Sequence, residues 1–149
     1  MTLKQKVHAY YLQQVNDRID AFRDMISALT EDASNDAKGS AGDKHETALS
    51  MMHIEQERLN SKLSEFLEQK SVLDKIDPNA SHPVIALGSL VKANAMHLFV
   101  SAALPKIIID GVQVIALSPQ SPLGQSIIGK KIADNFKIGT ANYIIEEIS

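Results

Sequence analysis

The first 38 residues contain neither glycine nor proline, and apolar side chains recur among them every three or four positions. These positions are Leu12, Val15, Ile19, Phe22, Ile26 and Leu29. Such spacing places them along one seam of an α-helix, as in a coiled coil. A second seam, with two polar interruptions, comprises Leu49, Met52, Gln56, Leu59, Leu63, Phe66, Lys70 and Leu73. The chain is therefore predicted to contain two long helices that each need a partner.

The segment between these seams, EDASNDAKGSAG at residues 31–42, is rich in small, polar and turn-forming residues. It is too short to form a domain but long enough to reverse the chain. An antiparallel coiled-coil hairpin over residues 1–76, with its tip around 31–47, is therefore the simplest arrangement. A dimeric coiled coil, or a module that binds another protein through its hairpin, stays an alternative. Because a tethered helix has a high effective concentration, we expect pairing within one chain and a monomer.

The pattern changes at Ile76-Asp77-Pro78, where the proline ends the second helix and residues 77–82 read as a linker. From residue 83 to residue 149 the apolar period is nearer two. Short β-branched segments occupy 84–93, 96–104, 106–118 and 141–149. The dipeptide Asp110-Gly111 between apolar runs predicts a hairpin turn. This half is expected to form a small sheet, which places the chain in the α+β class.

One segment of the second half predicts a short helix instead of a strand. Ser121 is a good N-cap, Pro122 fits the first helical position, and Gly129 is a C-terminal stop. The apolar pair Ile127-Ile128 lies between them and would cover one face of the sheet. Lys130 and Lys131 follow the stop, where lysines either complement the helix dipole or contact a partner.

The composition removes several kinds of chemistry. The chain has no cysteine, so a disulfide, a thiolate metal site and a cysteine nucleophile are excluded. Its five histidines do not form a zinc-binding motif, and no P-loop, GxSxG or GxGxxG motif is present. The net charge of −3 argues against a simple nucleic-acid binder. The acidic excess lies in residues 1–77, which hold 14 acidic and 10 basic side chains.

The N-terminal residues MTLKQKVHAYYLQQ are too polar for a signal peptide. No apolar run approaches the roughly eighteen residues that would suggest a membrane span. We therefore expect a cytoplasmic protein without membrane contact.

Two segments resemble the GreA/GreB family of transcript cleavage factors. Gly42-Asp43-Lys44-His45-Glu46-Thr47-Ala48 is similar to the family's tip motif Gly-Asp-Leu-x-Glu-Asn-Ala and falls where the hairpin turns. SPQSPLGQSIIGKKIAD at 118–134 is similar to the family's C-terminal Ser-Pro-Ile-x-x-x-Leu-Ile-Gly-Lys run. The order of the parts also agrees with the family. The resemblance implies a coiled-coil hairpin followed by an FKBP-like domain over residues 83–149.

The resemblance also implies a function. Members of the family bind RNA polymerase, place the hairpin in its secondary channel and stimulate the polymerase's own cleavage of backtracked transcripts. The expected protein is therefore an elongation factor and not itself an enzyme, with no cofactor of its own. Asp43 and Glu46 would help to hold a catalytic Mg²⁺ of the polymerase, and contact with RNA or DNA would occur only within that complex. The implied polymerase contacts are Ser121, Pro122, Gly129, Lys130 and Lys131.

The tip motif leaves two alternatives open. Asp43 and Glu46 are spaced as a helix capping box, in which both side chains would bond to backbone N–H groups. The motif also departs from the family pattern: Lys44 replaces a leucine, Thr47 replaces an asparagine, and the nearby aromatic residue is missing. A positive charge between the acids weakens cation binding. A regulator that occupies the channel without stimulating cleavage is therefore the alternative function.

Overall fold

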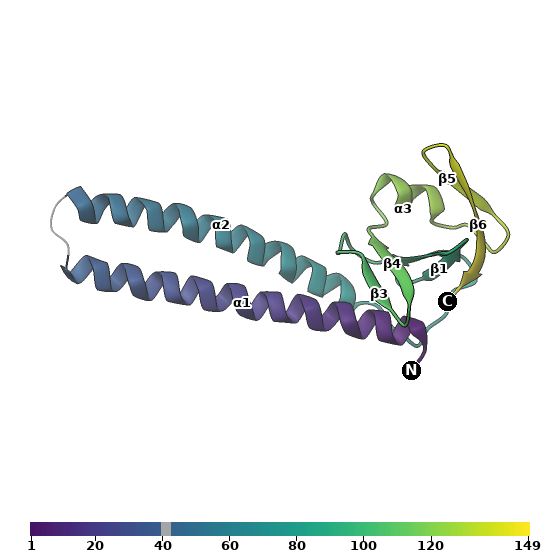
Figure 1. Cartoon of the computed structure of the whole chain (residues 1–149), viewed down its shortest axis with the longest axis horizontal. Helices are drawn as coiled ribbons and strands as arrows, with labels where there is room; N and C mark the ends of the chain where they lie inside the picture. Colours follow the sequence, from purple (N-terminus) through teal and green to yellow (C-terminus); the bar gives the residue numbers. More distant parts are fainter. Residues whose placement is uncertain (40–42) are drawn as a thin grey trace. The chain divides into compact units, whose positions relative to one another are not determined.

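The computed structural model describes the backbone of residues 1–39 and 43–149, and the side chains of residues 1–32 and 46–149. Two long helices come first, α1 (Leu3–Gly39) and α2 (Asp43–Asp74). The elements that follow (Figure 1) are β1 (Leu90–Ala93), β2 (Met96–Val100), β3 (Ile107–Ile109), β4 (Val112–Leu117), α3 (Pro122–Ile127), β5 (Asn135–Ile138) and β6 (Ala141–Ile148). The predicted α+β class, with two paired helices ahead of a small sheet and one short helix, is confirmed.

The chain divides into two compact units. One unit consists of Gln13–Lys70 and contains most of both long helices. The other joins Met1–Leu12 to Ser71–Ser149 and contains the whole sheet. The start of α1 therefore belongs to the same unit as the sheet. The domain boundaries inferred from the sequence, a hairpin to residue 76 and a second domain from residue 83, stay a prediction.

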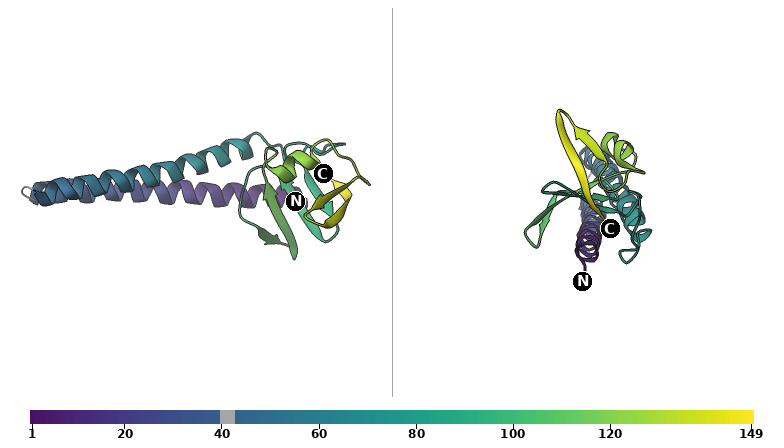
Figure 2. Two further views of the ribbon diagram at one scale, coloured as in Figure 1. Left: turned by 90° about the horizontal axis from the view of Figure 1, so that it is seen from above. Right: turned by 90° about the vertical axis from the view of Figure 1, so that its right-hand side faces the viewer.

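Within the helical unit, α1 and α2 run side by side in both Figure 1 and Figure 2. The Phe22 and Phe66 rings meet edge to face, with centroids 5.1 Å apart. Nearer the turn, the Gln56 amide donates to the Thr30 hydroxyl oxygen at 3.0 Å. Thr30 follows Phe22 in α1, whereas its partner Gln56 precedes Phe66 in α2. The two helices are therefore antiparallel. Every predicted seam position is buried or partly buried, which confirms both seams.

The sheet is mixed, with the strand order β3-β4-β2-β1-β6-β5. The pair β2 and β4 is parallel, and the other neighbouring pairs are antiparallel. Asp110 and Gly111 connect β3 to β4 with φ angles of 53° and 75°. Two consecutive positive φ angles are what a tight hairpin turn needs, and aspartate followed by glycine tolerates them best. The predicted turn is confirmed.

One face of the sheet packs against α3, which is visible beside the strands in Figures 1 and 2. Ile127 of α3 is completely buried there. The cluster that it joins consists of Ile85, Val91, Ala93, Leu98, Val100, Leu117, Phe136 and Ile145. These residues alternate along their strands with side chains of the opposite face, as the two-residue period of a strand requires.

The opposite face of the sheet receives Tyr11 from α1. The Tyr11 ring is fully buried and lies parallel to Phe99 of β2. Its hydroxyl donates to the Pro105 carbonyl at 2.7 Å. Burial raises the pKa of Tyr11 to about 12, so the phenol keeps its proton and remains a donor at neutral pH.

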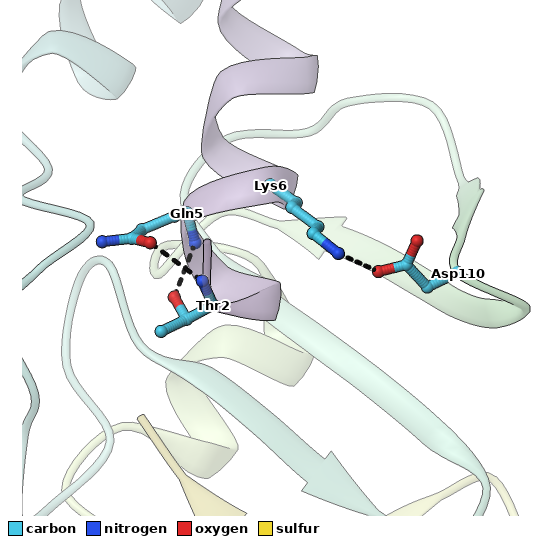
Figure 3. A network of polar contacts seen from close by, with 4 residues as sticks. All are labelled: Thr2, Gln5, Lys6 and Asp110. Atoms are coloured by element: carbon cyan, nitrogen blue, oxygen red, sulfur yellow. Dashed lines mark hydrogen bonds and ion pairs between the residues drawn. The ribbon is translucent and has the colours of Figure 1, made fainter.

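The start of α1 is also held by polar contacts, shown in Figure 3. The Gln5 N–H donates to the Thr2 hydroxyl at 3.1 Å, and the Thr2 N–H donates to the Gln5 side-chain oxygen at 2.8 Å. This reciprocal pair is a capping box, which satisfies N–H groups that the first helical turn leaves unpaired. One turn later, the Lys6 ammonium lies 2.6 Å from a carboxylate oxygen of Asp110. The helix start is therefore joined to the β3–β4 turn.

Candidate functional site

The predicted tip lies where α2 begins. Asp43 is the first residue of α2, and Glu46 lies in the same first turn with an exposed side chain. Positions 43 and 46 are three apart, a spacing that shares one face of a helix. Residues 40–42, and the side chains of Asp43 and Lys44, lie outside the described residues. The carboxylate roles predicted for Asp43 and Glu46, capping or metal binding, therefore stay predictions.

Beyond the first turn, α2 carries an exposed apolar pair. Met51 and Ile54 are each 67% exposed and are three residues apart, so they share one face of the helix. Both lie outside the seam that packs against α1. Sequence periodicity does not single them out, because it reports the apolar residues that fit the seam and not those that fall outside it.

The second predicted site is built around α3. Ser121 caps the helix: its hydroxyl accepts from the Gly124 N–H at 3.1 Å and donates to the Ser118 carbonyl at 2.7 Å. Pro122 is the first helical residue and its side chain is exposed. The predicted N-cap and first turn are confirmed, and these local roles leave Pro122 free to contact a partner.

The end of α3 differs from the prediction at one position. Ile127 is the last helical residue and is buried, but Ile128 is the C-cap and is 40% exposed. The expectation that both isoleucines lie within the helix is wrong for Ile128. The reason is geometric. Ile128 has an extended backbone, with φ −54° and ψ 132°, so its side chain does not continue the buried face of α3 on which Ile127 lies.

The residues after α3 join it to the rest of the unit through their backbone. Gly129 has φ 84°, the left-handed conformation that glycine adopts most easily, and its N–H donates to the Ile85 carbonyl at 2.8 Å. The Ile85 N–H returns a bond to the Lys130 carbonyl at 2.9 Å. The Lys131 N–H donates to an Asp134 carboxylate oxygen at 2.8 Å. The Lys131 side chain is exposed and that of Lys130 is partly buried.

Gly124 is a structurally constrained position of this segment that the sequence does not single out. A Cβ atom at Gly124 would lie 2.1 Å from the Ser118 carbonyl oxygen, which is backbone and cannot move aside easily. Only glycine therefore allows α3 to fold back over Ser118 and Pro119. A glycine in the middle of such a short helix was the available signal, since glycine disfavours helix interiors unless packing requires it.

A cavity of about 300 Å³ lies beside α3. It is lined by Pro122, Leu123 and Ser126 of α3 and by Lys137, Ile138 and Gly139 of the β5–β6 hairpin. Pro122 is thus the one predicted polymerase contact that lines this cavity. Its lining is mostly apolar, with Lys137 as its one charged side chain.

A different cavity, lined by Lys4, Lys92, His97 and Glu147 among others, was not predicted at all. Lys92 and His97 face each other across the β1–β2 hairpin, but Lys4 and Glu147 are distant from them in sequence, and only the folded sheet unit brings all four together. Across the described part of the chain, no group of three or more His, Cys, Asp or Glu side chains is placed to hold a metal ion. Over the same residues, no helix is long and apolar enough to cross a membrane.

No model of a protein family matches the sequence, and no curated protein matches it. The resemblance to the GreA/GreB family therefore depends on the tip motif, the run at 118–134 and the order of the elements.

Proposed function

We propose that this chain is a Gre-type elongation factor that binds RNA polymerase and places its helical hairpin in the secondary channel. Asp43 and Glu46 reach the active centre, where the polymerase cleaves a backtracked transcript. The chain acts as an accessory factor in the cytoplasm and contacts nucleic acid only inside the polymerase complex. The observation that carries the proposal is the position of the acidic tip motif, at the first turn of the second helix of an antiparallel hairpin.

The dimensions of the hairpin support this proposal. Each arm of the helical unit has about 27 residues, which at about 1.5 Å per residue gives a length on the order of 40 Å. Its described core is narrow, because Phe22 and Phe66 fill the space between only two helices. Two packed helices of this kind can enter a channel that would exclude a globular domain.

The chemistry of the tip is suited to assisting a metal ion that another protein holds. Mg²⁺ keeps several waters and takes only one or two carboxylates from a given protein. Asp43 and Glu46 could supply these to an ion that the polymerase already binds. A second metal ion in such a site stabilises the attacking and leaving oxygens of a phosphodiester hydrolysis. The factor then needs no metal or cofactor of its own.

The α3 region supports a separate role in docking. Pro122 and the cavity beside it offer an apolar hollow, and the exposed Lys131 adds a positive charge nearby in sequence. Ser121 and Gly129 act indirectly, because they fix the start and the end of α3. Lys130 contributes its backbone carbonyl to the unit and a partly buried side chain. We assign this surface to polymerase binding.

A second candidate function is occupation of the channel without cleavage. Lys44 lies between the two acids, and its ammonium lowers the affinity of their carboxylates for a cation. In that case the same hairpin would block or remodel the channel. Lys44→Leu should then create or increase cleavage, whereas in a cleavage factor it changes the rate only modestly.

The decisive experiment uses backtracked elongation complexes of the bacterial polymerase with a labelled transcript. The proposal predicts that the full chain shortens the transcript from its 3′ end and competes for polymerase with an established channel-binding factor. Competition without cleavage would favour the second candidate function. A chain that neither competes for polymerase nor co-purifies with it would overturn both and leave a hairpin that binds some other protein.

A further inference from the structure

A cavity of about 240 Å³ opens at one side of the sheet unit. Its walls come from the first turn of α1, residues 78–81, and the strands β1, β2 and β6. It lies on the face of the sheet opposite α3, because the β1 residues that line it are Leu90 and Lys92 and not their neighbour Val91. This cavity has no part in the proposed polymerase contacts.

Three ionisable side chains form a row across the floor of the cavity. Lys92 of β1 is the cross-strand partner of Glu147 in β6 and of His97 in β2. Cross-strand partners have Cβ atoms roughly 5 Å apart on one face of a sheet. Even so, no carboxylate oxygen in the described part of the chain lies within 4.0 Å of the Lys92 ammonium. The central charge of the row is therefore left without an ion pair.

The opposite wall of the cavity contains a buried ammonium group. Lys4 is only 3% exposed, and its Nζ donates to the Ala80 carbonyl at 2.6 Å. Burial lowers the pKa of Lys4, and the nearby charge of Asp77 opposes this only in part. Buried charges are normally paired, because removing a charge from water is costly. One neutral carbonyl, with the Asp77 charge nearby but not in an ion pair, is incomplete compensation, and an anion in the adjoining cavity would complete it.

We propose that this cavity binds the phosphoryl group of a small molecule, held between the ammonium groups of Lys4 and Lys92 with His97 at its side. Lysine binds phosphate as a point charge, whereas carboxylates are better matched by the planar fork of arginine, which is absent from the cavity. Glu147 lies beyond Lys92 in the row, on the side away from His97. Its carboxylate would repel a phosphate but can accept a hydrogen bond from a hydroxyl group of the same ligand.

The size of the cavity limits the ligand. Pockets for drug-sized molecules have volumes of roughly 300–1,000 Å³, and this one is smaller. A phosphate carrying a few carbon atoms fits, but a nucleotide does not fit entirely inside. The ligand class is therefore inorganic phosphate or a small hydroxylated phosphate monoester.

The test is a titration of the ¹⁵N-labelled full chain, at constant ionic strength, with inorganic phosphate and in parallel with glycerol 1-phosphate. We expect saturable shifts of the backbone amides of Lys4, Lys92 and His97, with a dissociation constant on the order of 1 mM or lower. Tighter binding of glycerol 1-phosphate, lost in Glu147→Gln, would identify an organic phosphate. Equal binding of both probes would identify the phosphate group alone as the ligand.

The variants separate a specific site from general attraction to lysines. Lys92→Gln should weaken phosphate binding by about tenfold or more, because a charge-assisted bond is lost. Lys106→Gln, which removes an exposed lysine of the same unit outside the cavity, should leave binding unchanged. Lys4→Met removes the buried ammonium and should likewise weaken phosphate binding. The amide spectrum of this variant reports whether the chain is still folded. Absence of saturable shifts, or equal weakening by Lys92→Gln and Lys106→Gln, would overturn the proposal.

Discussion

The ring of Tyr11 lies parallel to the ring of Phe99, with centroids 6.1 Å apart and planes inclined by 6°. Tyr11 belongs to α1 and Phe99 to β2, so the stack joins residues 88 positions apart in the chain. Because both side chains are completely buried, the start of α1 is part of the core of the sheet unit.

This contact predicts a large loss of stability on truncation. Tyr11→Ala should lower the free energy of unfolding by about 3–5 kcal/mol, the usual cost of removing a buried aromatic ring. Tyr11→Phe keeps the ring but leaves the Pro105 carbonyl without its donor, and should cost about 1–3 kcal/mol. Urea denaturation followed by circular dichroism measures both. The exposed Tyr10→Ala is the matched control, and a similar loss there would contradict the assignment.

The two isoleucines at the end of α3 predict opposite results for the same substitution. Ile127→Ala should cost about 2–5 kcal/mol, because it opens a cavity in the cluster beneath α3. Ile128→Ala should change stability by no more than about 0.5 kcal/mol, as is usual at exposed positions. Thermal melting of both variants would decide the matter. Equal losses would mean that α3 is rotated from the orientation found here.

The pKa of His97 predicts how stability depends on pH. Burial lowers this pKa, and the charge of Lys92 lowers it further, while Glu147 and Glu146 raise it by less. The unfolded chain therefore takes up a proton near pH 6.5 before the folded chain does. Stability should be unaffected above that pH and should fall as the pH drops from 6.5 through the lower pKa of the folded state.

His97→Gln isolates this effect, since glutamine is polar but does not titrate. The difference in urea midpoint between pH about 7.5 and pH about 5.5 should be smaller in the variant than in the parent. Among the residues that the structure describes, the buried Nδ1 atom of His97 has no hydrogen-bond partner, which adds to the cost of protonating it. A parent and variant with identical pH dependence would show that His97 titrates as freely when folded as when unfolded.

The internal pairing of α1 with α2 predicts a monomer. The seam residues Phe22 and Phe66 are already packed against each other within one chain, so this described part of the seam is not left for a second copy to cover. Sedimentation velocity at micromolar concentration should give a single species with the mass of one chain, 16.3 kDa. A stable dimer under those conditions would instead favour the interaction-module alternative.

Local signals predicted much of this fold. The seams, the Asp110-Gly111 turn and the Ser121 cap each depend on residues close in sequence, where periodicity or backbone preference decides the structure. The strand β5 went unpredicted because its sequence NFKI has only one buried residue, Phe136, and exposed neighbours. The Tyr11–Phe99 stack and the Lys4 cavity could not be predicted from one sequence, because they depend on which strands become neighbours.

The candidate site was predictable to a different degree. The position of Asp43 and Glu46 at the start of a helix followed from the motif and the seams, and α2 does begin at Asp43. What their carboxylates bind depends on a partner that supplies the metal. Neither the periodicity of the sequence nor the structure of this chain alone can therefore identify the ligand. That question needs an experiment in which folding and function can be separated.

The substitutions Asp43→Asn and Glu46→Gln provide this separation. If the two acids only cap α2, asparagine should serve nearly as well as aspartate, and stability and function should both survive. If they help to bind Mg²⁺ in the polymerase, the amides lose the negative charge that a hard cation needs. Melting temperature and competition for polymerase should then persist while cleavage of a backtracked transcript falls by about tenfold or more, since a change of 1.4 kcal/mol in barrier already gives that factor.

The matched control is Glu57→Gln, which removes one exposed carboxylate from α2 outside the tip. It should leave folding, polymerase competition and cleavage unchanged, because Glu57 lies about four turns from the start of α2 at Asp43. Full cleavage by both tip variants would restrict Asp43 and Glu46 to capping. Loss of cleavage in all three variants would mean that the overall acidity of the hairpin matters and that no specific metal ligand is present. Loss confined to Asp43→Asn and Glu46→Gln, with melting and competition intact, is the result that the proposed function requires.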